Sequence, residues 1–75
     1  MTEVEKQILE DVLYIIKYDG DCSDIPCYAN DCPIFTPCRQ HYYKHGKPFL
    51  AKRRVKECEK ILKKYSKEDI FEAAL

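Results

Sequence analysis

The chain has 75 residues, of which 45% are hydrophobic and 35% charged, and its 13 basic and 13 acidic side chains give a formal net charge of zero. A chain of this length forms one domain at most and buries only about 60% of its unfolded surface, so it needs a stabilising element besides its hydrophobic core. No apolar run approaches the roughly 18 residues of a membrane span, and the composition is not that of a disordered chain.

The distribution of charge and cysteine bears on compartment and partners. The N-terminal residues are acidic and contain no apolar signal core, which predicts a cytoplasmic, reducing environment and no membrane association. Five cysteines are an odd number, which fits a closed disulfide framework poorly. Residues 1–38 carry eight acids and two bases, whereas residues 39–75 carry eleven bases and five acids. The molecule is therefore a charge dipole if the fold keeps its two halves apart.

The first helix is expected at about residues 2–18. Thr2 and Glu5 match a capping box at its start, and Gly20 provides a stop. The apolar residues of this segment cover about half of the helical circumference, so the helix must pack against more than one neighbour. They are Val4, Ile8, Leu9, Val12, Leu13, Ile15 and Ile16.

A turn-rich loop follows at residues 19–36, where glycine and proline alternate with repeated aspartate and asparagine. Thr36 and Pro37 then match an N-cap followed by proline at the first helical position. This pair predicts a short helix at about residues 37–45, which Gly46 ends.

Two further helices are expected in the C-terminal half. Pro48 favours the start of a helix at about residues 48–65, and Ser66 with Asp69 is a capping pair for a short helix at about residues 67–74. The apolar face of the longer helix consists of Leu50, Ala51, Val55, Cys58, Ile61, Leu62 and Tyr65.

Four cysteines lie within seventeen residues as Cys-x4-Cys-x4-Cys-Pro-x4-Cys, at Cys22, Cys27, Cys32 and Cys38. Four thiolates on one short loop can converge on a tetrahedral ion, so we interpret them first as a zinc site that supplies folding energy. An iron–sulfur cluster is the alternative, because a cysteine–proline pair also closes some ferredoxin ligand runs, and it would make the protein a redox or sensor protein. Disulfides and free thiols rank after these two. The expected fold is an all-α single domain, residues 1–75, with three or four helices organised around a cysteine-rich metal-binding loop.

Three other side chains are alternative ligands. Cys58 lies in the middle of an apolar helix face, so we interpret it first as a core residue, although a helix packed over the loop would let it replace Cys22. His41 and His45 lie on the same side of the predicted short helix as Cys38, at a spacing found in zinc fingers. Their tyrosine and lysine neighbours favour exposed surface histidines instead.

A band of cations runs opposite the apolar face of the 48–65 helix. This basic stripe suits an acidic protein partner or, as an alternative, the phosphates of a nucleic acid; a solvated outer face without a partner is the third interpretation. The stripe consists of Lys52, Arg53, Lys56, Lys60, Lys63 and Lys64.

Catalysis and small-molecule substrates are not expected. The chain has only two glycines and no glycine-rich phosphate loop. A metal ion that already holds four protein ligands has no open position for water or substrate. The sequence therefore predicts a non-catalytic, zinc-stapled interaction module.

The segment Cys-Ser-Asp-Ile-Pro-Cys-Tyr-Ala-Asn-Asp-Cys-Pro-Ile-Phe-Thr-Pro-Cys resembles small cysteine-rich proteins encoded by large tailed bacteriophages. This chain departs from their pattern in having four residues, not two, between its second and third cysteines. The resemblance covers roughly residues 20–65 and implies an accessory or host-encounter role in the host cytoplasm, as an adaptor or inhibitor. It also implies that the ligand quartet is Cys22, Cys27, Cys32 and Cys38, with Cys58 outside it.

Overall fold

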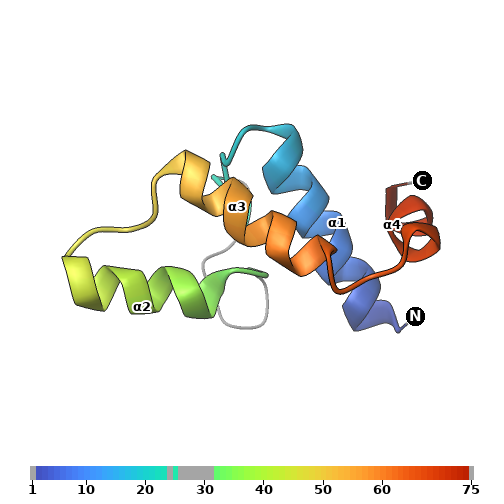
Figure 1. Cartoon of the computed structure of the whole chain (residues 1–75), viewed down its shortest axis with the longest axis horizontal. Helices are drawn as coiled ribbons and strands as arrows, with labels where there is room; N and C mark the ends of the chain where they lie inside the picture. The colour runs from blue at the N-terminus through green and yellow to red at the C-terminus, as the bar shows by residue number, and fades with distance from the viewer. Residues whose placement is uncertain (1, 24, 26–31, 75) are drawn as a thin grey trace.

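The computed structural model describes residues 2–23, 25 and 32–74, and within them the chain forms four helices and no strand (Figure 1). This confirms the expected all-α class. No helix in this part of the chain is long and apolar enough to cross a membrane. The predicted ligand Cys27 lies outside the described residues. The helices are α1 (Glu3–Lys17), α2 (Phe35–His45), α3 (Ala51–Leu62) and α4 (Lys67–Ala74).

Local capping signals start α1 and α4. The Thr2 hydroxyl accepts a hydrogen bond from the Glu5 backbone N–H at 3.1 Å, and the Glu5 carboxylate accepts one from the Thr2 N–H at 3.4 Å. The Ser66 hydroxyl likewise accepts from the Asp69 N–H at 3.2 Å. Both predicted capping pairs are therefore confirmed, because each satisfies backbone donors that have no acceptor within their own helix.

The start of α2 differs from the prediction. The helix begins at Phe35, and its N-cap is Ile34, which makes no side-chain capping bond, so Thr36 is not the cap. Pro37 is compatible with the earlier start because N–H groups in the first turn have no intrahelical acceptor for the proline ring to remove. The predicted end is confirmed, since Gly46 adopts a left-handed conformation with φ of 73°.

Helix α3 starts three residues later and ends three residues earlier than the predicted helix over 48–65. Leu50 is extended, with φ of −72° and ψ of 159°, and acts as the N-cap. The residue before it, Phe49, is only 4% exposed, and its ring contacts the His41 ring with centroids 4.7 Å apart. This long-range burial of Phe49 holds the connection to α3 in an extended path, which helical periodicity cannot reveal.

The turn after α1 lies directly against the first turn of α3. Gly20 has a φ of +90°, and a Cβ at this position would collide with the Ala51 carbonyl oxygen and lie 2.8 Å from the Ala51 Cα. Arg54 also donates from Nη1 to the Gly20 carbonyl oxygen at 3.0 Å. Only glycine permits both the conformation and this close approach of two backbones.

Helix α1 is central and packs against both α3 and α4 (Figure 1). Helix α2 contributes no fully buried residue. Val4 and Leu50, predicted on apolar faces, are 70% and 75% exposed; each lies at the start of its helix, outside the packed middle. The buried residues are Leu9, Val12, Ile15, Ile25, Cys32, Ile34, Phe49, Cys58 and Ala73.

The molecule is elongated, with extents of 38 × 22 × 21 Å. Helix α4 and the N-terminal end of α1 lie at one end of the long axis, and α2 reaches toward the other (Figure 1). The first turns of α1 and α4 carry acidic residues, whereas the first turn of α2 has none and its last turn is basic. The acidic first turns of α1 and α4 thus lie at the opposite end of the long axis from the basic last turn of α2.

Candidate metal centre and basic face

Three of the predicted ligands line one cavity of about 160 Å³, which we call the cysteine pocket. Cys22 reaches it from the turn after α1, Cys32 from the segment before α2, and Cys38 from α2 itself. The structure therefore brings together side chains separated by as many as sixteen positions in the sequence. The other residues of the lining are Ile34, Phe35, Arg39, Tyr42, Pro48 and Arg54.

Two consecutive turns fix the position of Cys22. The Asp21 carboxylate accepts hydrogen bonds from the Ser23 N–H at 3.0 Å and from the Ser23 hydroxyl. These two bonds from Ser23 lower the pKa of the Asp21 carboxyl. The Cys22 carbonyl then accepts from the Ile25 N–H at 3.0 Å. Aspartate and serine flanking the cysteine thus make a local hydrogen-bonded frame for its thiol.

The entry into α2 fixes Cys32 and Cys38. The Cys32 carbonyl accepts from the Phe35 N–H at 3.2 Å, in a turn that leads into the helix. The Cys38 N–H donates to the Ile34 carbonyl at 3.0 Å, so Cys38 lies one helical turn further on. The turn at Cys32 and the first turn of α2 together bring the Cys38 thiol to the cavity that Cys32 also lines.

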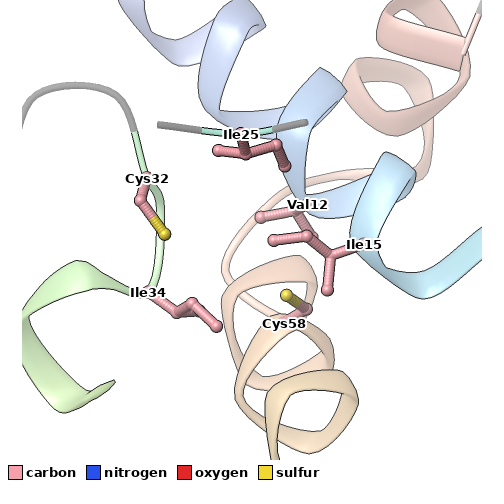
Figure 2. Close-up of a cluster of buried hydrophobic side chains, with 6 residues drawn as sticks. All are labelled: Val12, Ile15, Ile25, Cys32, Ile34 and Cys58. Carbon is pink, nitrogen blue, oxygen red and sulfur yellow. The ribbon is translucent and has the colours of Figure 1, made fainter. Parts of the chain in front are cut away.

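Cys58 occupies a different place, in the hydrophobic core. It is fully buried on α3, and in Figure 2 its sulfur and that of Cys32 both point into the cluster formed with Val12, Ile15 and other apolar side chains. Burial raises the pKa of the Cys58 thiol to about 12, and the neighbouring Cys32 and Cys22 add smaller contributions. Without a metal, Cys58 is therefore a neutral core thiol at physiological pH.

Arg54 is a site residue that the sequence analysis did not identify. It lines the cysteine pocket, and its buried Nε has no hydrogen-bond partner among the described residues. A buried N–H without an acceptor costs about 1–3 kcal/mol, which a thiolate sulfur at this site would recover. The available signal was its spacing, because Arg54 lies four residues before Cys58 and therefore on the same side of the helix.

The side chains of the cysteine pocket have the chemistry of a metal centre but not its ligand geometry. Among the described residues, no three His, Cys, Asp or Glu side chains are already arranged to hold a metal ion, and the four described cysteines are free thiols. Four thiolates around a divalent ion carry a net charge of −2, which the guanidinium groups of Arg39 and Arg54 on the pocket lining would offset. The zinc site stays a prediction that these neighbours support.

The alternative histidine ligands lie elsewhere. His41 and His45 line a second cavity with Lys47, Pro48, Leu50 and Arg53, and neither lines the cysteine pocket. His41 Nδ1 lies 2.9 Å from the Lys47 carbonyl oxygen, to which it donates. The two imidazole rings contact each other in a tilted arrangement, with centroids 4.5 Å apart and an interplanar angle of 41°. These contacts favour a structural and surface role for the pair.

All six side chains of the basic stripe are exposed, but two of them are paired. Glu57, whose side chain is only 12% exposed, forms salt bridges with Arg53 at 3.1 Å and with Lys60 at 3.2 Å. The stripe therefore offers less free charge to a partner than its sequence suggests.

A stronger concentration of charge lies nearer the cysteines and was also missed. Residues 32–56 contain seven lysines and arginines and no aspartate or glutamate. Neither the charge of each half of the chain nor the charge on the faces of one helix isolates this segment. The seven cations are Arg39, Lys44, Lys47, Lys52, Arg53, Arg54 and Lys56.

Comparison of the chain with protein-family models, with curated proteins and with solved structures gives no match. The resemblance to small phage proteins therefore stays a prediction.

Proposed function

We propose that this protein is a non-catalytic interaction module in which a cysteine-bound zinc ion holds α2 in place and presents the basic end of the molecule to an acidic macromolecule. The observation that carries the proposal is the convergence of Cys22, Cys32 and Cys38 on one cavity, against the unpartnered Nε of Arg54. Tetrahedral ligation by thiolates is the preferred environment of structural zinc.

The packing of the helices explains why a bound metal ion would stabilise the position of α2. Extensive helix–helix contacts join α1 to α3 and to α4, and α2 has none of comparable extent. Its position depends on the segments that flank it, and Cys32 and Cys38 lie at its start. A metal ion shared by these thiols and Cys22 would fix α2 to the end of α1. The free energy of metal binding then becomes folding free energy.

The fourth ligand distinguishes two versions of the centre. Cys27 completes the quartet predicted from the sequence, and the alternative predicted there has the buried Cys58 in place of Cys22. Cys58 packs in the hydrophobic core and does not line the cysteine pocket, so we propose Cys27 as the fourth ligand. An iron–sulfur cluster would use the same thiols, and it would give a coloured protein when purified without oxygen.

Cobalt substitution of serine variants tests the ligand set. The reduced, metal-free protein is titrated with Co²⁺, whose tetrahedral thiolate complexes absorb in the visible range. We expect Cys22→Ser, Cys32→Ser and Cys38→Ser to lose most of the absorption and Cys58→Ser, the matched control, to retain it. An unchanged spectrum in the first three variants would contradict the proposed centre.

The charge of the partner follows from the acid-free segment 32–56. An adaptor or inhibitor that docks on an acidic protein would use this charge for steering and orientation. Nucleic acid is the second candidate, and the arrangement of aromatic rings among the cations of α2 is the specific observation that favours it. Neither partner requires a catalytic group from this chain.

A further inference from the structure

Helix α2 carries two rings with a cation between them along one side, which we call the ladder. Phe35, Arg39 and Tyr43 are spaced four residues apart, so they follow one another along the helix surface. The guanidinium carbon of Arg39 lies 5.4 Å from the centroid of the Phe35 ring and 5.7 Å from that of Tyr43. Tyr43 is 75% exposed. Phe35 packs against the core at the edge of the cysteine pocket, while Arg39 and Tyr43 are exposed, so the ladder presents a cation and a ring to solvent.

A second group of rings connects α2 to the start of α3. The His41 ring lies between those of His45 and Phe49, with centroid separations of 4.5 and 4.7 Å. Arg53 lies over the Phe49 ring, with its guanidinium carbon 5.5 Å from the ring centroid. This group orders the connection that carries the exposed Lys47, and so fixes cations of α2 relative to those of α3.

The cations of α2 and of the connection that follows it are more available than those of the basic stripe. Within the described part of the chain, no carboxylate pairs with Arg39, Lys44 or Lys47, whereas Glu57 pairs with two members of the stripe. Arg39 and Tyr43 are exposed, so this part of the ladder is open to a ligand. Free positive charge and exposed ring faces thus occur on the same element.

We propose that α2 binds single-stranded nucleic acid, with bases stacked on Tyr43 and Arg39 and phosphates contacted by Lys44 and Lys47. Aromatic platforms among cations are the typical surface for single strands, because unpaired bases expose their faces. A duplex hides those faces, and an acidic protein would use the charge without needing the rings. The inference deepens the proposed function by naming its partner, and it depends on the zinc centre only for the placement of α2.

Fluorescence anisotropy with the zinc-loaded protein tests this inference. The probe is a labelled oligothymidylate about a dozen nucleotides long, compared with a duplex of similar length and with a polyglutamate peptide. We expect the single strand to bind most tightly and its affinity to fall as salt is raised. Tyr43→Leu keeps charge and bulk, and should weaken binding to the single strand about tenfold because one stacking platform is lost.

Two further variants separate stacking from charge. Arg39→Lys keeps the positive charge but removes the planar guanidinium, so it should also weaken binding severalfold. Lys63→Gln removes a charge at the far end of α3 and should leave binding to the single strand nearly unchanged. Tyr43 and Lys63 are exposed and do not line the cysteine pocket, so Tyr43→Leu and Lys63→Gln should keep the helical content and zinc content of the original protein. Arg39 lines the pocket, so Arg39→Lys is compared with the original protein at equal zinc content.

Three results would overturn the inference. These are no binding to the single strand, equal binding to single strand and duplex with no effect of Tyr43→Leu, or tighter binding to polyglutamate, which would identify an acidic protein partner. Zinc content is measured on the same samples. A protein that holds zinc but does not bind the oligonucleotide would contradict only this inference, whereas binding by a protein that holds no zinc would contradict the proposed zinc centre.

Discussion

The junction between the end of α1 and the start of α3 can be tested with two glycine substitutions. Gly20→Ala places a methyl group at a φ of +90° and against the Ala51 backbone, 2.8 Å from its Cα, where ordinary contacts begin at 3.4 Å. Gly46→Ala is the matched control, because it has a φ of +73° but no atom within 4 Å of the new Cβ.

The two variants should differ by the cost of the collision. A left-handed conformation costs a non-glycine residue about 1–2 kcal/mol, and the loss of unfolded-state entropy returns about 0.4–1 kcal/mol. Gly46→Ala should therefore lower the free energy of unfolding by about 1 kcal/mol. Overpacking against backbone adds about 1–3 kcal/mol, so Gly20→Ala should lose about 2–4 kcal/mol in all.

Urea unfolding followed by far-ultraviolet circular dichroism measures both losses. For a domain of this size, about 1 kcal/mol corresponds to a shift in Tm of about 4–8 °C, so the difference is also visible in thermal unfolding. Equal losses for the two variants would refute the close approach of the Gly20 turn to α3, and with it the placement of Arg54 beside the cysteine pocket.

Two other predictions concern the site residues. In the reduced, metal-free protein, the folded pKa of Cys58 at about 12 exceeds its ordinary value of 9.0, so the unfolded state loses its proton first. The free energy of unfolding should therefore fall by up to about 1.4 kcal/mol per pH unit above pH 9. Urea unfolding of the original protein and of Cys58→Ala between pH 8 and pH 10.5 measures this, and the variant should lack this component of the fall. If the free energy of unfolding depends on pH equally in the two proteins, Cys58 is not a buried neutral thiol. Arg54→Met should lower zinc affinity about 10- to 100-fold in competition with a chelator, because it removes a donor to the ligating sulfurs. Unchanged affinity would exclude Arg54 from the centre.

Features encoded by neighbouring residues could be predicted from the sequence. The capping pairs at Thr2 and Ser66 and the stop at Gly46 each depend on contacts within a few residues, and the structure has all three. The buried position of Cys58 followed from helical periodicity, because the side chain lies in the middle of an apolar face.

Features that depend on distant contacts could not be predicted in this way. The late start of α3 reflects the burial of Phe49 beside the ring of His41, a partner on another helix. The role of Arg54 depends on the Gly20 carbonyl, thirty-four positions earlier in the chain. In the sequence, Arg54 lies beside charged residues of the exposed helix face, so nothing local indicates that it is partly buried. Three of the four cysteines expected to converge line one cavity. The fourth, Cys27, lies outside the described residues.

The central claim is that a cysteine-bound zinc ion holds this fold together. Its most direct test is native mass spectrometry of the reduced protein, purified without chelator, combined with circular dichroism during chelator titration. We predict one zinc ion per chain and a loss of cooperative unfolding as the ion is removed. A metal-free protein that keeps its helical content and cooperative unfolding would contradict the claim.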